Sequence, residues 1–329
     1  MLLAAAPSMG NAAPFAKGAD VGWLPQMEAS GFTFRGDDGK PADCLDVLKQ
    51  HGMDTIRLRV WVNPSQDPRS GHCSRDEVAA MAERAHKKGF RIMIDFHYSD
   101  TWADPSHQPK PKAWEKHDLQ QLKRDVFDHT TDVLKALKAR GVTPEWVQVG
   151  NEIANGMIWP DGHFPHNAKN LAELLNEGHS AVKTIDPDIK VIIHLHGGNN
   201  NGMFRGFFDQ MEKLGVKYDI IGMSYYPFWD KKPHAETIGD LARNLDDMAE
   251  RYQKPVMVVE VGGESEQPEE TRAMLEAVIR KVRAVPENKG LGVIYWEPQS
   301  AFSWSHYKLN CWNNDGRPTE ALDAFLESK

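Results

Sequence analysis

The chain has 329 residues, of which 40% are hydrophobic and 26% are charged, and this composition excludes a disordered or fibrous protein. Its formal net charge of −8 argues against nucleic acid or an anionic membrane surface as a partner, so a neutral ligand is expected. No apolar run reaches the length of a membrane span, so no integral membrane segment is expected.

The first segment of the chain is a leader that we place outside the folded domain. Residues 1–14 are apolar and rich in small side chains, which is typical of the end of a secretory signal peptide. A leader without any function has the same composition. The first interpretation predicts that the protein is exported.

Eight short runs rich in β-branched residues, each bounded by turn signals, predict strands. In chain order they are 19–21, 55–60, 91–96, 146–150, 190–194, 220–224, 256–260 and 292–296. Helical patterns lie between them. One helix opens with the capping box Ser74 to Glu77 and ends at Gly89, and a longer helix spans 119–141. Apolar residues at helical spacing mark three more, within 171–182, 241–248 and 275–282.

This alternation of strands and helices predicts one (β/α)8 TIM barrel, an α/β fold, over residues 15–329. A doubly wound sheet is the alternative. That fold usually carries a glycine-rich phosphate-binding turn after its first strand, and the corresponding segment here, GADVGWLPQ, lacks the pattern. The barrel is therefore the favoured fold.

In a TIM barrel the active site lies at the C-terminal ends of the strands, so polar and aromatic residues there are candidates for function. From the second strand to the eighth these are Arg57, Arg59, Trp61, Asp95, His97, Tyr98, Asn151, Glu152, His194, His196, Tyr225, Tyr226, Glu260, Trp296 and Glu297. We leave Glu297 without a role. Asp95 is expected to be a buried partner of an inward arginine rather than a catalytic group.

Two carboxylates in this set predict the chemistry. Glu152 follows the fourth strand and Glu260 ends the seventh, so the barrel brings both to one mouth. Paired carboxylates that act as acid/base and as nucleophile are the groups that a retaining glycosidase needs. The acid must be held protonated by its surroundings, and the nucleophile must be held ionised by hydrogen-bond donors.

Donors for the nucleophile are present in the same strands. Arg57 and Arg59 alternate with apolar residues, so both point into the barrel, where an unpaired guanidinium is costly. We expect Glu260 to be a partner of these arginines. Tyr225 could donate a phenolic hydrogen bond to the same carboxylate, and Asn151 could hold the 2-hydroxyl of a sugar.

Aromatic residues at strand ends and in the following connections predict a carbohydrate-binding groove, because the C–H faces of sugars pack on indole rings. They are Trp61, Trp102, Trp114, Trp159, Trp229, Trp296 and Trp304. Any one of them alone is better explained by barrel or lid packing, and it is their number on one rim that favours a groove. His97 and His194 are either substrate ligands or hydrogen-bonded barrel residues. The residues that we expect to bind substrate are Arg57, Arg59, Trp61, His97, Trp102, Asn151, Trp159, His194, Tyr225 and Trp296.

The chain resembles glycoside hydrolase family 53, the endo-β-1,4-galactanases, in eight motifs that cover nearly its whole length. They are GADVGWLPQME, DTIRLRVWVNP, IDFHYSDTWADP, VQVGNEIANGMIWP, MSYYPFW, VVEVGG, VIYWEP and NNDGRPTEALDAF. The resemblance implies a clan A barrel and retaining hydrolysis of β-1,4-galactan in pectin side chains. It matches Glu152 to the acid/base and Glu260 to the nucleophile. It also matches Arg57, Asn151 and Tyr225 to the subsite of the reacting sugar, with Trp296 as the platform beneath that sugar.

Two segments depart from the family pattern. Val261-Gly262-Gly263-Glu264 follows the nucleophile in place of a small residue and an aromatic-proline run, and Gln299-Ser300 follows the YWEP motif in place of an early aromatic. Both lie in the loops after the last two strands. We expect these changes to affect the number of subsites and the product lengths, and to leave the chemistry unaltered.

No metal and no cofactor is expected. The loops hold no Asp/Asn-rich ligand cluster, and Cys44, Cys73 and Cys311 have an odd count and no CxxC spacing, so free thiols are expected. The chain is expected to act as an exported monomer on galactan or galacto-oligosaccharides, without nucleic acid. The alternatives are another clan A activity, namely a β-mannanase, a xylanase or an exo-acting β-galactosidase, and a non-catalytic polysaccharide-binding protein.

Overall fold

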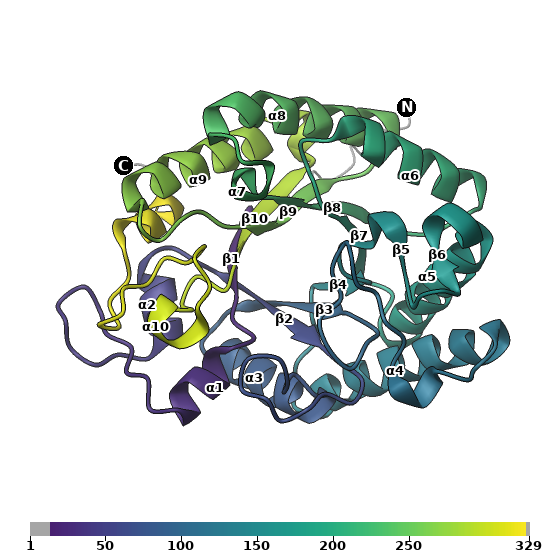
Figure 1. The fold of residues 1–329 in the computed structure, drawn as a ribbon, viewed down its shortest axis with the longest axis horizontal. Coiled ribbons are helices and arrows are strands. Elements are labelled where there is room, and N and C mark those ends of the chain that lie inside the picture. The colour runs from purple at the N-terminus through teal and green to yellow at the C-terminus, as the bar shows by residue number, and fades with distance from the viewer. Residues whose placement is uncertain (1–13, 327–329) are drawn as a thin grey trace, which may run out of the picture.

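Eight parallel strands close into a barrel in the computed structural model, which describes residues 14–326 (Figure 1). The barrel strands are β1 (Ala16–Asp20), β2 (Thr55–Val60), β3 (Arg91–Phe96), β4 (Trp146–Val149), β7 (Lys190–Leu195), β8 (Ile220–Tyr225), β9 (Val256–Val261) and β10 (Gly290–Trp296). Each pairs with the next barrel strand along the chain, and β10 closes the ring on β1. The predicted (β/α)8 barrel is confirmed. Residues 1–13 of the predicted leader lie outside the described residues.

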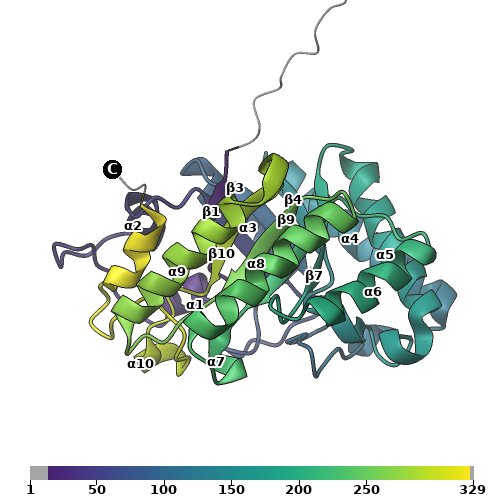
Figure 2. The same ribbon diagram turned by 90° about the horizontal axis from the view of Figure 1, so that it is seen from above.

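Helices surround the barrel (Figures 1 and 2). The longer ones are α2 (Cys44–Gln50), α3 (Arg75–Lys87), α4 (Leu119–Ala139), α5 (Phe164–Ile185), α6 (Asn201–Lys213), α8 (His234–Arg251) and α9 (Pro268–Arg283). Two of these helices begin at capping boxes, which form at Ser74 for α3 and at Asp118 for α4. Within residues 14–326 no helix combines the length and the apolarity needed to cross a bilayer.

Shorter elements decorate the loops after the strands. They are α1 (Leu24–Ala29), α7 (Pro227–Asp230), α10 (Phe302–Ser305), the 3-10 turns η1 (Lys112–Trp114), η2 (Ile153–Asn155), η3 (Pro286–Asn288) and η4 (Glu320–Phe325), and a hairpin of β5 (Gly156–Met157) and β6 (Gly162–His163). Figure 2 shows α7 and α10 at the edge of the molecule opposite the edge at which β1 begins. That edge is therefore the C-terminal mouth of the barrel.

The barrel interior changes from apolar to polar towards this mouth. A small cluster of buried side chains, separate from the main core between barrel and helices, includes Met93, Trp146 and Ile192. Two residues further along the same strands, and so on the same face, lie the buried polar residues Asp95, Gln148 and His194. The strands thus close the bottom of the barrel with apolar packing and present polar groups above it. All three cysteines are buried and free, as expected.

Candidate active site

Arg57 is the centre of the polar layer. Its guanidinium is fully buried and forms ion pairs with Asp20 Oδ2 at 2.7 Å, with Asp95 Oδ2 at 2.9 Å and with Glu260 Oε1 at 2.9 Å. A buried guanidinium is tolerated only when its charge and its N–H groups are satisfied, and three carboxylates achieve this here. The expected partnership of Arg57 with Glu260 is present, and Asp95 is the expected partner of an inward arginine.

Glu260 lies on β9 with only 6% of its surface exposed. Besides the ion pair with Arg57, it accepts a hydrogen bond at Oε2 from the Tyr226 hydroxyl at 3.2 Å. Tyr225, which was expected to be able to donate to this carboxylate, does not do so, and that expectation is wrong. Tyr225 is the last residue of β8, and its hydroxyl lies 2.8 Å from Thr237 Oγ1 on α8, outside the barrel. Ile220 and Ser224 of the same strand face the interior, so the alternation of side chains directs Tyr225 outward and Tyr226 into the mouth.

Glu152 follows β4 in a left-handed backbone conformation, with φ of 51° and ψ of 45°. This region is sparsely populated by residues other than glycine and costs roughly 1–3 kcal/mol, which the packing around the strand end must offset. The carboxylate accepts a hydrogen bond from Ser224 Oγ at 2.6 Å. Ser224 is also the backbone neighbour of Glu260 in the pairing of β8 with β9. One serine therefore links the positions of the two carboxyl groups.

A series of hydrogen bonds indicates which oxygen of Glu152 carries a proton. Arg57 Nε donates to Gln148 Oε1 at 2.8 Å, so the amide group of Gln148 is the one that faces His194 Nδ1, at 3.0 Å. The backbone N–H of Glu152 points at the same ring nitrogen, at 3.4 Å. Asn151 Oδ1 also lies 3.0 Å from Nδ1, so this nitrogen faces two donors and one acceptor. The two donors favour the tautomer in which Nδ1 accepts and Nε2 carries the hydrogen, and we assign that tautomer.

The directions of the remaining hydrogen bonds follow from this tautomer. His194 Nε2 donates to Ser224 Oγ at 2.8 Å, so the one hydrogen of the serine is directed to Glu152 Oε1. Burial holds the pKa of His194 well below its usual value, which keeps the ring neutral. In this tautomer Glu152 Oε1 accepts the serine hydrogen, and a proton bound by Glu152 is carried by Oε2.

The two carboxyl groups differ in which form their surroundings favour. Burial raises the pKa of Glu152 to about 7, against the opposing hydrogen bond from Ser224. Burial also raises the pKa of Glu260, and repulsion from Glu152 adds to the effect. Arg57 bonds directly to Glu260, and in residues 14–326 no cation forms an ion pair with Glu152. The ion pair with Arg57 therefore favours the ionised form of Glu260 more than that of Glu152.

Both carboxyl groups line a pocket of about 650 Å³ at the mouth of the barrel. Aromatic walls come from Trp102, Trp229, Trp296 and Tyr307. Of the residues that the sequence assigned to substrate, four line this pocket: His97, Trp102, Asn151 and Trp296. Within residues 14–326, no group of three or more His, Cys, Asp or Glu is arranged to hold a metal ion.

The other expected substrate contacts lie behind the pocket wall. Arg59 is buried against Glu297 and Asp20, and its guanidinium lies 4.5 Å from the ring centre of Trp102. Trp61 is fully buried and donates to His97 Nδ1 at 3.1 Å. Neither Arg59 nor Trp61 lines the pocket. Both instead pack behind residues that form the pocket wall. They were expected in the pocket because strand periodicity predicts the direction of a side chain but not its depth in the barrel.

Three more residues from the expected set are placed as follows. Trp159 donates to the Asn155 carbonyl at 3.0 Å and packs on His163, away from the pocket. Arg57 and His194 are fully buried and do not line the pocket. Arg57 and His194 therefore affect a substrate only indirectly, through their contacts with Glu260 and Asn151.

Sequence reasoning missed several groups of the site. Gln148 alternates with Val147 and Val149, so its inward position could have been inferred from the strand pattern. Ser224 ends the predicted sixth strand and could have been included for the same reason. Tyr307 comes from the loop after β10, and no pattern in the sequence places it in the mouth.

The chain matches one known protein family over nearly all of its length. A family model described as "Glycosyl hydrolase family 53" matches residues 16–325. An uncharacterized protein of Niallia circulans is 39% identical, over 91% of this chain and 88% of its own length. An arabinogalactan endo-beta-1,4-galactanase of Cellvibrio japonicus is 33% identical, over 99% of this chain and 94% of its own. The solved GH53 catalytic domain of Ignisphaera aggregans superposes with a TM-score of 0.86 at 29% identity, over 98% of both chains.

Proposed function

Because the chain belongs to glycosyl hydrolase family 53, we propose that it is a retaining endo-β-1,4-galactanase that cleaves the galactan of type I arabinogalactan. The observation that carries the proposal is the unequal environment of its two carboxyl groups. Glu260 is held by Arg57 and Tyr226, which favour its ionised form, and Glu152 is desolvated with its proton directed to Oε2. An ionised nucleophile beside a protonated acid is the starting state of a double displacement. The galactanase of Cellvibrio japonicus, similar over nearly the whole chain, supports the substrate.

The first chemical step forms a covalent sugar–enzyme intermediate. Glu260 attacks the anomeric carbon while Glu152 Oε2 donates its proton to the departing glycosidic oxygen, so the leaving chain departs as a neutral alcohol. As Glu260 loses its charge to the new bond, Arg57 remains paired with Asp20 and Asp95. Glu152, now ionised, is stabilised by the hydrogen bond from Ser224.

The second step returns the enzyme to its starting state. Glu152 accepts a proton from water, and the water oxygen attacks the anomeric carbon from the face that the leaving chain vacated. Glu260 departs as a carboxylate into its contacts with Arg57 and Tyr226. Two inversions give net retention at the anomeric carbon.

Two residues are proposed to position the reacting sugar. Asn151 uses one hydrogen of Nδ2 on the Ala103 carbonyl, at 2.8 Å, and the second hydrogen of Nδ2 is proposed to bind the 2-hydroxyl. Trp296 lines the pocket beside Trp102, with the ring centroids 5.9 Å apart, and is proposed as the platform beneath the ring. Contacts to the 2-hydroxyl strengthen in the oxocarbenium-like transition state, so Asn151 is expected to affect kcat more than KM.

The setting in which the enzyme works is part of the proposal. A polysaccharide is too large to enter a cell intact, so the protein is proposed to act outside the cell. One chain supplies every group of the site, and the protein acts as a monomer. The net charge of −8 suits a neutral polysaccharide and not nucleic acid.

Product analysis on debranched β-1,4-galactan tests this function. The wild type is expected to release short galacto-oligosaccharides from within the chain, and Glu152→Ala and Glu260→Ala are expected to lose nearly all of this activity. Glu287→Ala, an exposed glutamate next to β10 at the far end of the barrel, is the matched control and is expected to behave as the wild type. A wild type that is inert on galactan but cleaves mannan or xylan would overturn the substrate. Binding without any cleavage would overturn catalysis altogether.

A further inference from the structure

A second cavity lies beside the catalytic pocket. It has a volume of about 750 Å³ and is formed by residues 227–234, which include α7, and by residues 262–274, which lead from β9 into α9. Trp229 lines both the cavity and the catalytic pocket. A polymer that leaves the catalytic pocket across this indole therefore enters the second cavity.

Trp229 is unusually exposed for its size. Its exposed fraction is 64%, the highest among the large hydrophobic residues that the structure describes. The neighbouring Phe228 ring supports it edge-on, with the centroids 4.8 Å apart and an interplanar angle of 81°. An exposed indole in a cleft is typical of a binding surface, and the C–H face of a sugar covers it well.

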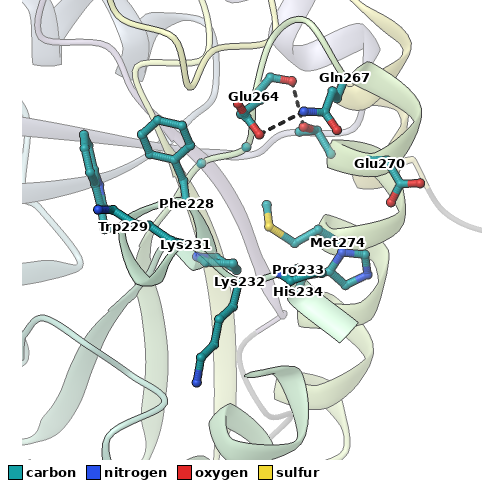
Figure 3. A pocket seen from close by; sticks show the side chains of 14 residues that line it. Phe228, Trp229, Lys231, Lys232, Pro233, His234, Glu264, Gln267, Glu270 and Met274 are labelled. Carbon is teal, nitrogen blue, oxygen red and sulfur yellow. Dashed lines mark hydrogen bonds between the residues drawn. The ribbon is translucent and has the colours of Figure 1, made fainter. Parts of the chain in front are cut away.

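Polar groups face these aromatic rings across the cavity. Figure 3 shows Phe228 and Trp229 on one side, with Gln267 and Met274 on the other. Gln267 Nε2 donates to Glu264 Oε2 at 3.0 Å, which leaves the second oxygen of that carboxylate and Gln267 Oε1 as acceptors. These acceptors suit the hydroxyl groups of a ligand.

The charges that line the cavity are of both signs. Lys231 and Lys232 come from the segment after α7, whereas Glu264 and Glu270 come from the opposite side. Lysines balanced by carboxylates do not select an anion or a cation. Apolar rings combined with hydroxyl-binding groups of balanced charge suit a neutral sugar.

The loop that forms the cavity also carries the nucleophile. Glu260 is followed by Val261, and a Cβ atom on Gly262 would lie only 3.0 Å from the Tyr226 ring. A Cβ on Gly263 would lie 2.5 Å from Thr271 Oγ1. Only glycine allows the loop to run this close to both partners. The wall of the cavity is therefore packed closely against Tyr226, which donates to Glu260.

We propose that this cavity is a subsite for a further neutral galactosyl unit of the chain whose neighbouring units occupy the catalytic pocket, with Trp229 as the platform between them. The inference rests on the proposed function. It assigns substrate binding to the Gly262-Gly263-Glu264 segment, at which the sequence departs from the family pattern.

A chain-length series tests the subsite. Values of kcat/KM are measured on β-1,4-galacto-oligosaccharides of increasing length for the wild type, Trp229→Ala, Trp229→Tyr and Gln267→Ala. The wild type is expected to gain about tenfold at the length that first fills the cavity, since one well-packed sugar contact corresponds to about that factor. Trp229→Ala and Gln267→Ala are expected to lose most of this gain, and Trp229→Tyr, which keeps a flat ring, is expected to restore part of it.

Phe302→Ala is the control, because Phe302 is an exposed aromatic residue on α10 that lines neither cavity. It is expected to keep the full gain. The inference is overturned if both Trp229→Ala and Gln267→Ala keep the gain, or lower kcat/KM equally at every length. A wild type that cleaves no galactan overturns the proposed function, and the subsite with it.

Discussion

Replacing Ser224 by alanine removes the hydroxyl that donates to Glu152 Oε1 at 2.6 Å. A hydrogen bond to a charged group contributes about 1.5–3 kcal/mol, and this one favours the ionised form of Glu152. Its loss lowers the acid dissociation constant of Glu152 by a factor of about 10 to 100. The pKa of Glu152, about 7 in the wild type, therefore rises.

The expected result follows from the two steps of the reaction. Protonated Glu152 is needed for bond cleavage, so kcat/KM falls as pH rises through its pKa, and in Ser224→Ala this fall moves to higher pH. The same hydrogen bond stabilises the charge that develops on Glu152 as its proton leaves, so its loss is expected to slow galactan cleavage by up to about 10- to 100-fold. An aryl galacto-oligosaccharide with a dinitrophenyl leaving group needs no proton for departure, and its cleavage step is expected to change much less.

The assay is a pH profile of kcat/KM on both substrates for the wild type, Ser224→Ala and Ser224→Thr. Threonine keeps the hydroxyl and is expected to keep the basic limb of the wild type. The reasoning is refuted if Ser224→Ala shows an unshifted limb. It is refuted equally if both substrates slow by one common factor, since a purely structural loss has that effect.

Two further predictions concern the same pair of carboxyl groups. Tyr226→Phe removes the donor to Glu260 and is expected to lower kcat by about tenfold or more. Tyr225→Phe removes a hydroxyl that contacts Thr237, and is expected to cost only about 1 kcal/mol of stability. Steady-state kinetics and urea unfolding of both variants check this, and equal kinetic losses would contradict it. In thermal unfolding, Glu152→Gln is expected to gain stability relative to the wild type as pH rises. The folded carboxyl binds its proton up to about pH 7 and the unfolded one only to about 4.5, so the wild type loses stability between these values. Because Glu152 is partly exposed, we expect a gain of about 1–2 kcal/mol, and a difference that is constant from pH 4 to 8 would contradict the prediction.

The barrel could be predicted from the sequence because its strands are buried on both faces and bounded by turns. The predicted bounds of β2 and β3 match the structure, whereas β1 was placed at 19–21 and begins at Ala16. The cause is Gly18, which interrupts the apolar pattern. A Cβ there would lie 2.5 Å from Ile294 Cδ1, so the closure of β1 on β10 requires a glycine that the strand pattern disfavours.

Two barrel helices were missed for local reasons. Helix α6 begins with Asn201-Gly202 and contains Gly206, and such residues lower helix propensity. Helix α2 has only seven residues, too few to show a periodic pattern. Tertiary packing stabilises both: Phe204 and Phe207 of α6 are buried, and Phe207 packs on Phe164 of α5.

The site was predicted well where a strand ends and less well beyond it. Glu152 and Glu260 were found because a parallel barrel brings strand ends to one mouth. Tyr225 was chosen in place of Tyr226, although Ile220 and Ser224 point inward and the alternation along β8 therefore directs Tyr226 into the mouth. The placement of Tyr307 and the second cavity depend on how two loops fold over the mouth, and one sequence does not encode that in any local pattern.

Azide rescue tests the assignment of the two glutamates most directly. Glu152→Ala and Glu260→Ala are each incubated with a dinitrophenyl β-galacto-oligosaccharide and sodium azide, and the anomeric configuration of the glycosyl azide is determined by NMR. Glu152→Ala is expected to give the β-azide, because azide attacks the covalent intermediate on Glu260. Glu260→Ala is expected to give the α-azide, because azide attacks the substrate in place of the missing nucleophile. The reverse pattern, or the same anomer from both variants, would contradict the account.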